Sequence, residues 1–125
     1  MSYKYKAVKM KNGINEKESF YPVPANGIQV DTEFLAKEIA FASSLTPGDV
    51  MATIEALRTA IIRSLQMGRT IKLDKFGVFS MSITSQPESS PEDLLPHKVK
   101  MKKVCFRADK RMNTELKHTQ FERKQ

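Results

Sequence analysis

Apolar side chains recur at two different periods along the chain, and the change of period separates helical from extended segments. Between residues 31 and 68 they recur every three or four positions, which predicts two helices. The first is expected to begin at a cap on Asp31 or Thr32 and to be ended by Ser43-Ser44-Leu45, and the second is expected over residues 46–68. Thr46 suits the N-terminal cap of the second helix, and Gly68 suits its left-handed end.

After the second helix the period becomes two, as in a strand with one buried face. A hairpin is predicted over residues 70–84, with its turn at Lys75-Phe76-Gly77. Residues 85–96 are rich in Ser, Pro and acidic side chains and predict a loop or a mobile arm. A third strand is predicted over residues 98–107, with a bulge at Lys102-Lys103, where the alternation changes phase.

Smaller elements are predicted at the two ends of the chain. Residues 1–25 predict a loose β-hairpin whose loop spans residues 12–18, and two prolines confine its second strand to a sheet edge. A phase shift at Ala7-Val8 predicts a bulge or a twist in its first strand. Asp109 is expected to cap a short basic helix, and residues 118–125 are expected to form a flexible tail.

The composition limits the class of protein. A length of 125 residues fits one compact domain, and 40% hydrophobic with 28% charged residues is typical of a soluble globular protein. No apolar run approaches the ~18 residues that a membrane span needs. Residues 1–6 lack the apolar core of a signal peptide. The one cysteine, Cys105, cannot form an internal disulfide, which suits a reducing compartment.

Catalytic chemistry is not predicted, and neither is a metal or cofactor site. His97 and His118 stand apart from any recognisable nucleophile pattern. Together with one cysteine they cannot supply four zinc ligands. None of the five glycines belongs to a phosphate-binding loop. Cys105 alternates with Val104 and Phe106, so we interpret it as a small half-buried side chain on the opposite strand face rather than a reactive thiol.

Basic residues outnumber acidic ones and are unevenly distributed. The chain has 21 Lys and Arg against 14 Asp and Glu, a formal net charge of +7. Residues 1–30 contribute +3, residues 31–68 contribute −2 and residues 69–125 contribute +6. The densest stretch is 98–111, where Asp109 is the single acid. This excess predicts a polyanionic partner, and the alternative is a solvated charged surface.

The second helix carries more apolar surface than one small chain can cover. We therefore predict a homodimer, and the alternative is a closely packed monomer. The expected dimer core consists of Ile54, Leu57, Ile61, Leu65, Phe76, Phe79 and Phe106.

Four short segments carry a family resemblance. They are Leu45-Thr46-Pro47-Gly48-Asp49-Val50, Gly68-Arg69, Phe76-Gly77-Val78-Phe79 and Phe106-Arg107-Ala108-Asp109-Lys110. Together they resemble the HU/IHF family of bacterial histone-like DNA-binding proteins, and the Phe-Gly-x-Phe turn is the most specific of them. The first 30 residues, with Tyr21-Pro22-Val23-Pro24, resemble the extension of a subset of HU-like proteins.

The resemblance implies an α+β fold of the HU/IHF type. It has two N-terminal helices, a three-stranded antiparallel sheet with a β-arm and a short C-terminal helix, here with an extra N-terminal β-hairpin. The implied domains are an N-terminal β extension over 1–30, an HU-like DNA-binding domain over 31–117 and a flexible tail over 118–125. The implied function is that of a nucleoid-associated homodimer in the bacterial cytoplasm. It would bind and condense double-stranded DNA in a largely sequence-independent manner.

The expected DNA-binding residues are bases of the sheet and of the last helix. They are Lys72, Lys75, Lys98, Lys100, Lys102, Lys103, Arg107, Lys110 and Arg111. Lys98, Lys100 and Lys102 share one parity, so their ammonium groups are expected to point the same way from the strand. The charges of Lys110 and Arg111 oppose the dipole of the last helix, and a bound phosphate would relieve that repulsion.

The arm departs from the family pattern. Ser80, Ser82 and Thr84 stand where the family has arginines that point at DNA, and Ser89-Ser90-Pro91-Glu92-Asp93 stands in place of its Arg-Asn-Pro tip. Pro91 is a possible intercalating residue; the alternative is a loop proline, because the adjacent acids repel phosphate. We therefore expect mild coating of DNA rather than sharp bending.

Other interpretations stay open. The scaffold would instead be a protein-interaction module with weak or no DNA binding if the hairpin at residues 1–25 served as a docking edge. RNA binding is a further alternative. The run Tyr3-Lys4-Tyr5-Lys6 would either contact nucleic acid or supply a strand whose tyrosines pack inward.

Overall fold

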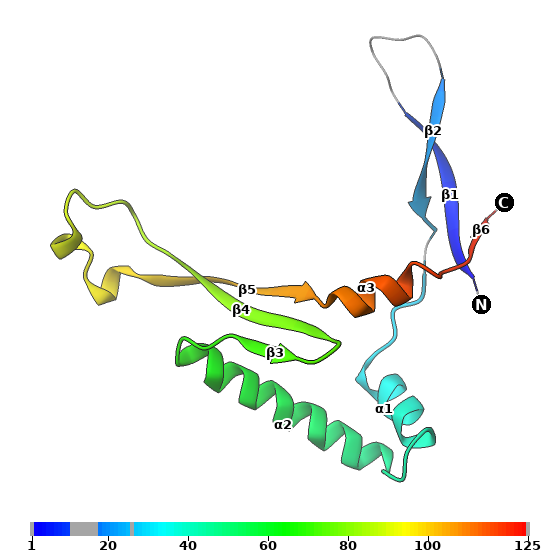
Figure 1. The fold of residues 1–125 in the computed structure, drawn as a ribbon, viewed down its shortest axis with the longest axis horizontal. Coiled ribbons are helices and arrows are strands. Elements are labelled where there is room, and N and C mark those ends of the chain that lie inside the picture. Colours follow the sequence, from blue (N-terminus) through cyan, green and yellow to red (C-terminus); the bar gives the residue numbers. More distant parts are fainter. Residues whose placement is uncertain (1, 11–17, 26, 125) are drawn as a thin grey trace. The chain divides into compact units, whose positions relative to one another are not determined.

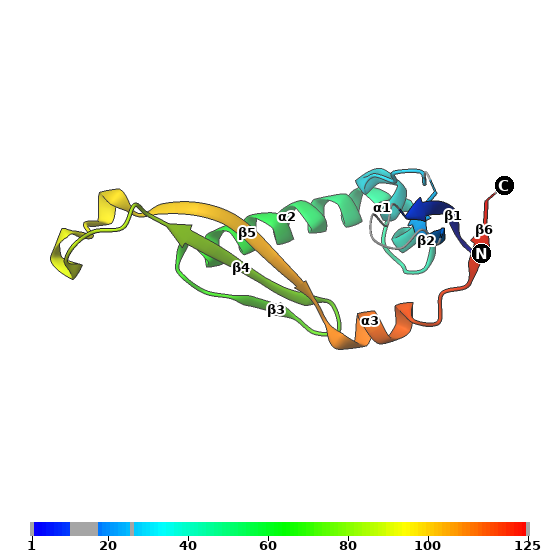
Figure 2. The same cartoon turned by 90° about the horizontal axis from the view of Figure 1, so that it is seen from above.

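The computed structural model describes residues 2–10, 18–25 and 27–124. Their helices and strands form two compact units (Figures 1 and 2). We call Met1–Asp31 with Thr114–Gln125 the terminal unit, and Thr32–Asn113 the central unit. The hairpin loop predicted over residues 12–18 lies, except for Glu18, outside the described residues.

The two helices of the central unit form where the apolar period predicted them. Helix α1 spans Thr32–Phe41 and ends just before the predicted stop at Ser43-Ser44-Leu45, and α2 spans Pro47–Gln66. The start of α2 is fixed by a reciprocal cap. The backbone N–H of Asp49 donates to Thr46 Oγ1 at 3.1 Å, and the backbone N–H of Thr46 donates to Asp49 Oδ2 at 3.3 Å. The predicted cap is confirmed.

Helix α2 ends in a Schellman motif. Gly68 has a φ of 77°, which is the left-handed conformation predicted for it. Its N–H donates to the carbonyl of Leu65 at 3.0 Å, and the N–H of Arg69 donates to the carbonyl of Ser64 at 3.0 Å. These bonds satisfy two carbonyls at the helix end and turn the chain toward the sheet.

The central sheet has the strand order β3-β4-β5 and is antiparallel throughout. Strand β3 spans Ile71–Leu73, β4 spans Gly77–Thr84 and β5 spans Lys100–Ala108. Helix α2 contacts both β3 and β4. Strand β5 begins two residues later than predicted, because Lys98 belongs to the 3₁₀ turn that precedes it.

Gly77, the first residue of β4, occupies a position where a side chain has no room. A Cβ there would lie 2.4 Å from Phe106 Cε2 and 2.6 Å from the carbonyl oxygen of Arg107. The space belongs to a cluster of three rings, in which the centroids of Phe79 and Phe106 are 4.9 Å apart and Phe76 stands edge-on to Phe106 at 5.9 Å. The absence of a side chain at Gly77 therefore allows β4 and β5 to pack closely beside the three phenylalanine rings.

The predicted bulge in β5 is confirmed. Ser82 pairs with Lys103 and Ile83 pairs with Met101, so Lys102 is the extra residue. The segment predicted as a loop or an arm connects β4 to β5 and contains two 3₁₀ turns, η1 over Pro91–Asp93 and η2 over Pro96–Lys98.

A short helix follows the central sheet. Helix α3 spans Lys110–Leu116, and Asp109 Oδ1 accepts a hydrogen bond from the backbone N–H of Arg111 at 2.8 Å. The N–H of Asp109 donates to the carbonyl of Phe76 at 3.0 Å, which anchors the helix start to the β3–β4 turn. The predicted cap at Asp109 is confirmed.

The terminal unit contains a second sheet, with the strand order β2-β1-β6. Strand β1 spans Tyr3–Met10 and pairs antiparallel with β2, Ser19–Pro24, which lies at the sheet edge as its prolines require. The register runs without interruption through Ala7-Val8, so the bulge considered there is absent. Instead of a fraying tail, Phe121–Arg123 forms β6, which pairs with β1 in parallel.

The described residues bury few side chains. Only Ala36, Val50 and Leu65 among their hydrophobic residues are buried, whereas many large apolar side chains of the helices and of both sheets are exposed. Within residues 2–10, 18–25 and 27–124, no helix is both long and apolar enough to cross a membrane.

Candidate nucleic-acid interface

One face of the central sheet collects basic and hydroxyl side chains. Residues that pair across antiparallel strands project to the same face. Lys72 pairs with Val78, which in turn pairs with Arg107, so both bases lie in one row across the sheet. Further along the same face, Ser82 pairs with Lys103 and Thr84 pairs with Lys100. We call Lys72, Lys100, Lys103 and Arg107 the basic face.

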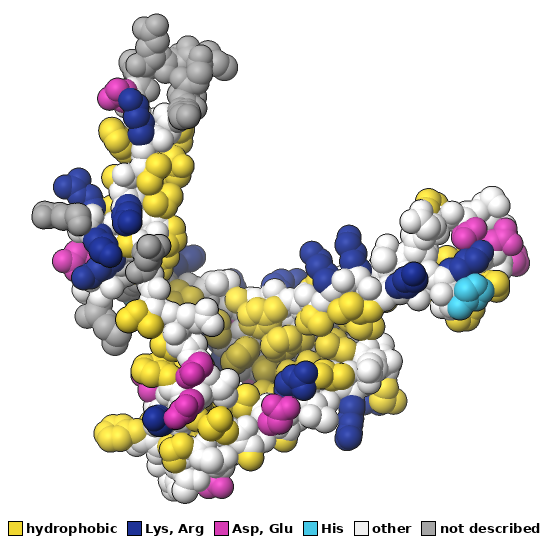
Figure 3. Space-filling model, turned by 180° about the vertical axis from the view of Figure 1, so that it is seen from behind, with side chains coloured by type: hydrophobic (Ala, Val, Ile, Leu, Met, Phe, Trp, Pro, Cys, Tyr) yellow, Lys and Arg dark blue, Asp and Glu magenta, His cyan; other side chains and the backbone are white. Residues whose placement is uncertain are grey.

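The opposite face of this sheet is apolar. Phe79 pairs with Phe106 there, and Met81 pairs with Val104. Figure 3 shows Lys and Arg side chains projecting from one side of the sheet, with hydrophobic side chains gathered on the other. Cys105 pairs with Ser80 on the face of the bases and is half-buried, as predicted.

The positive charge of the basic face is not offset by any acidic side chain in the strands of this sheet. Strands β3, β4 and β5 contain no acidic residue. All four bases of the basic face are exposed. Lys103 and Arg107 are four positions apart on β5, about 13 Å by strand rise, and Lys72 and Arg107 are separated by two strand spacings, about 10 Å. Four cations on one surface form a site for a polyanion.

The bulge changes which bases share that face. The prediction that Lys98, Lys100 and Lys102 point the same way from the strand is wrong for Lys98, which belongs to the turn η2. Lys102 is the extra residue of the bulge, and the register places Lys100 and Lys103 on one face.

Lys98 lies away from the strand and binds the arm. Its Nζ is 3.1 Å from Glu88 Oε1 and donates to the carbonyl oxygen of Asp93 at 3.0 Å. The contact with Glu88 offsets its charge locally, so the structure removes Lys98 from the group of bases that the sequence placed together.

The remaining predicted bases lie at the edges of the sheet. Lys75 is in the β3–β4 turn with a φ of 65°, and Lys110 and Arg111 form the first turn of α3. The structure thus does not place these three in the rows of the basic face.

The arm tip is built around acidic side chains. Pro91 is exposed and opens the 3₁₀ turn η1, which continues with Glu92 and Asp93. Ser90 Oγ donates to Asp93 Oδ2 at 2.9 Å. Two carboxylates thus follow directly on the proline.

The side chains predicted for a dimer core are unevenly covered in one chain. Leu65 is buried, and Ile54, Ile61 and Phe79 are half-buried. Leu57, Phe76 and Phe106 are 41%, 46% and 49% exposed. The apolar surface of this group extends over α1, where Phe34, Leu35 and Ile39 are each more than 40% exposed.

Sequence reasoning missed the row that joins Lys72 to Arg107. Both bases were predicted separately, but their adjacency depends on the pairing of three strands. A signal was present: the turn at Lys75-Phe76-Gly77 fixes the β3–β4 register, which places Lys72 opposite Val78.

The sequence profile of one family matches residues 1–123, almost the whole chain. Its description is an HU domain fused to a wHTH, Ig or glycine-rich motif. The chain belongs to this HU-HIG family. The resemblance to HU that the sequence indicated is confirmed.

Solved structures share the fold of this HU-HIG chain. A putative bacterial DNA-binding protein from Bacteroides vulgatus aligns with a TM-score of 0.66 and 11% identity, over 98% of this chain and 49% of its own. The present chain thus spans about half the length of that protein. HU from Anabaena, in a cocrystal with DNA, aligns with a TM-score of 0.52 and 18% identity, over 70% of this chain and 97% of its own. No curated protein matches the chain.

Proposed function

We propose that this HU-HIG chain binds double-stranded DNA through the basic face of its central sheet, with little dependence on sequence. The observation that carries the proposal is the strand register, which gathers Lys72, Lys100, Lys103 and Arg107 on one face with no acid in the three strands. The DNA-bound Anabaena HU of similar fold supports the choice of polyanion. Lys102 in the bulge of β5, with Lys75, Lys110 and Arg111 at the edges of the sheet, would add phosphate contacts.

The basis of recognition follows from the residue types. Lysine ammonium groups and the arginine guanidinium bind phosphate oxygens, which every duplex presents. The hydroxyls of Ser80 and Thr84 project from the same face and offer hydrogen bonds to the same oxygens, whereas Ser82 Oγ donates to the carbonyl oxygen of Lys103 at 3.3 Å. A surface of this kind neutralises phosphates and releases counterions without reading bases. The role is architectural and non-catalytic, and its place is the bacterial nucleoid.

We further propose that the protein acts as a homodimer in the HU arrangement. Its support is the uncovered apolar surface of α1, α2 and the phenylalanine cluster, where Leu57, Phe76 and Phe106 are each more than 40% exposed. Covering this surface with a second copy removes apolar area from water, which at ~25 cal/mol per Å² is the dominant favourable term in association. The dimer would place two basic faces on one DNA molecule.

The arm favours coating over kinking. Glu92 and Asp93 follow Pro91 in the turn η1, so a proline wedge would bring two carboxylates to the phosphates. We therefore assign Pro91 to the turn and not to intercalation.

Paired charge-removal variants test the DNA-binding surface. The variant with Lys103→Ala and Arg107→Ala loses two bases of the basic face. The control with Lys37→Ala and Arg58→Ala loses two exposed helical bases of the same unit. For the first we expect weaker binding to duplexes of any sequence and a log–log salt slope reduced by about 0.9 per lost contact. For the control we expect little change. If the Lys103→Ala, Arg107→Ala variant bound duplex DNA as tightly as the wild type, the assigned face would be rejected. If the wild-type chain did not bind duplex DNA, a protein-interaction module would be favoured.

A further inference from the structure

The terminal sheet has an aromatic face that the duplex-binding proposal does not use. Tyr5 pairs with Pro24 in β2, and Tyr3 pairs with Phe121 in β6. Paired residues project to the same side of a sheet, so rings and prolines from three strands share this face. The five aromatic side chains of the terminal unit include all three tyrosines of the chain.

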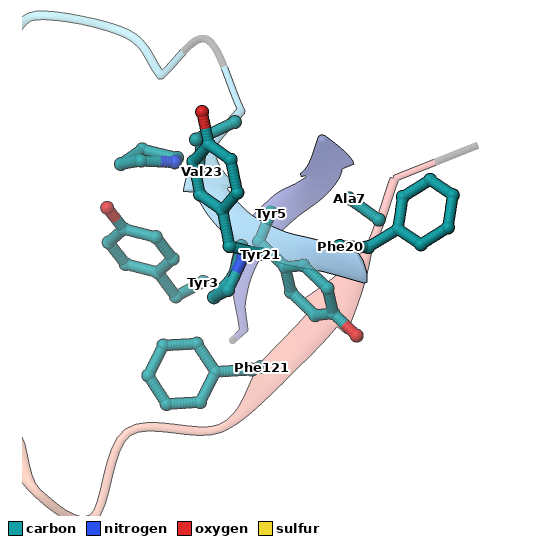
Figure 4. Close-up of a pocket in the computed structure, with 9 residues that line it drawn as sticks. Tyr3, Tyr5, Ala7, Phe20, Tyr21, Val23 and Phe121 are labelled. Atoms are coloured by element: carbon teal, nitrogen blue, oxygen red, sulfur yellow. The ribbon is translucent and has the colours of Figure 1, made fainter. Parts of the chain in front are cut away.

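A groove of about 610 Å³ lies on this sheet (Figure 4). All five aromatic side chains line it: Tyr3, Tyr5, Phe20, Tyr21 and Phe121. The other described residues of its lining are alanine, valine and proline, and none of the described lining residues is charged. Tyr21 has the opposite parity on the edge strand β2, so the groove extends around that edge. The walls that these described residues form are therefore flat apolar surfaces.

The rings of this groove are held in place but remain open to solvent. Tyr3 and Phe121 meet edge to face with centroids 5.5 Å apart. Phe121 is nevertheless 65% exposed, and Phe20 is 62% exposed. Exposed rings fixed on a sheet are the stacking surfaces that single-stranded nucleic-acid-binding proteins use, because every base has an apolar face.

The net charge of the terminal unit favours an anionic partner. The described residues of the terminal unit include Lys4, Lys6, Lys9, Lys117, Arg123 and Lys124 against Glu18, Asp31, Glu115 and Glu122, six bases minus four acids, or +2. Arg123 pairs with Tyr5, so a cation stands on the aromatic face itself. The charge of Lys9 is offset by Glu18 at 2.7 Å. Flat apolar walls with a cation beside them fit bases linked by phosphates better than an uncharged apolar peptide.

We propose that this aromatic groove binds unpaired DNA, with bases stacked on its rings and phosphates near Arg123. The choice of DNA over RNA rests on the proposed function, because a protein on duplex DNA meets unpaired DNA at junctions, nicks and melted tracts. The stacking site itself is separate from the basic face, since every residue that lines it belongs to the terminal unit.

Tyrosine fluorescence reports on this groove specifically. The chain has no tryptophan, and its three tyrosines all line the groove. We expect an oligo(dT) strand of about 12 nucleotides, within the usual site sizes, to quench the emission. A blunt duplex bound at the basic face should leave it nearly unchanged. The variant with Lys103→Ala and Arg107→Ala should keep the quenching, so failure of duplex binding and failure of the groove are distinguishable.

A conservative double substitution tests stacking against simple apolar contact. Tyr3→Leu with Phe121→Leu keeps the groove apolar but removes two rings, and we expect oligo(dT) affinity to fall by about 5- to 100-fold. The control is Phe41→Leu in α1, which removes a 95% exposed ring outside the groove and should leave that affinity unchanged. Circular dichroism verifies that both variants fold.

Three results would overturn the proposal. The first is tyrosine emission that oligo(dT) does not change. The second is unaltered oligo(dT) affinity in the folded leucine variant, which would indicate a groove for an apolar protein segment. The third is equal or stronger quenching by oligo(rU), which would reject DNA as the ligand.

Discussion

Lys72 and Arg107 lie in one row across the central sheet, on either side of Val78, with which both are paired. They are 35 positions apart in the sequence and about 10 Å apart in the sheet, from two strand spacings. Three strands thus place two cations side by side on the surface that we propose for DNA.

The separation within this row predicts independent contributions of Lys72 and Arg107. At about 10 Å each base reaches its own phosphate, so the losses in binding free energy of Lys72→Ala and Arg107→Ala should add in the double variant within about 0.5 kcal/mol. Each single variant should also lower the salt slope by about 0.9. The check is a double-mutant cycle from anisotropy titrations at several salt concentrations. A coupling well above that value would mean that both bases contact one phosphate.

The space around Gly77 predicts a strong effect of a single methyl group. Gly77→Ala places a Cβ within 2.4 Å of Phe106 Cε2 and 2.6 Å of the Arg107 carbonyl oxygen, so a strand must move. We expect a loss of about 1–3 kcal/mol in the free energy of unfolding, measured by urea denaturation. Gly48→Ala is the matched control, because the nearest atom to its Cβ is Thr46 Oγ1 at 3.9 Å. A Gly77→Ala protein as stable as that control would contradict the described turn.

Local sequence signals were sufficient to predict much of the secondary structure of the central unit. The cap at Thr46, the left-handed Gly68 and the turn at Gly77 each depend on the chemistry of a few neighbouring residues, which the sequence shows directly. The bulge at Lys102 was also visible, as a change of phase. Its consequence for the register was not carried across, so Lys103 was left out of the group that contains Lys100.

Features that depend on contacts between distant parts of the chain could not be predicted from local sequence patterns. Strand β6 has three residues and forms by parallel pairing with β1, more than 100 positions earlier, so no local pattern identifies it. The alternation of residues predicted that Lys98 belongs to the strand. In the structure it belongs to the 3₁₀ turn that begins at Pro96, and its ammonium group forms an ion pair with Glu88 in the arm. The aromatic groove likewise requires three strands from both ends of the chain.

The arm tip predicts little effect of its proline on DNA shape. If Pro91 belongs to the turn and does not intercalate, Pro91→Ala should change duplex affinity less than about 2-fold and leave the DNA bend angle unchanged. Energy transfer between dyes at the two duplex ends measures the bend. If Pro91→Ala markedly reduced the DNA bend angle, the result would indicate that Pro91 intercalates.

The uncovered apolar surface predicts a dimer in solution. Sedimentation equilibrium should give a mass near twice the 14.2 kDa of one chain. Leu57→Glu places a charge in the proposed interface, and we expect it to shift the mass toward one chain or to lower the thermal midpoint, because an unpaired buried charge is costly. A wild-type mass of one chain at micromolar concentration would exclude the dimer and, with it, the pairing of two basic faces on one DNA molecule.

Lysine footprinting tests most directly whether the basic face binds DNA. Acetylation of the free protein and of its complex with duplex DNA, followed by mass spectrometry, reports each lysine separately. We predict protection of Lys72, Lys100 and Lys103 in the complex, while Lys37 on α1 and Lys98 in the arm stay reactive. Equal reactivity of Lys72, Lys100 and Lys103 with and without saturating duplex would contradict the assignment of this face to DNA.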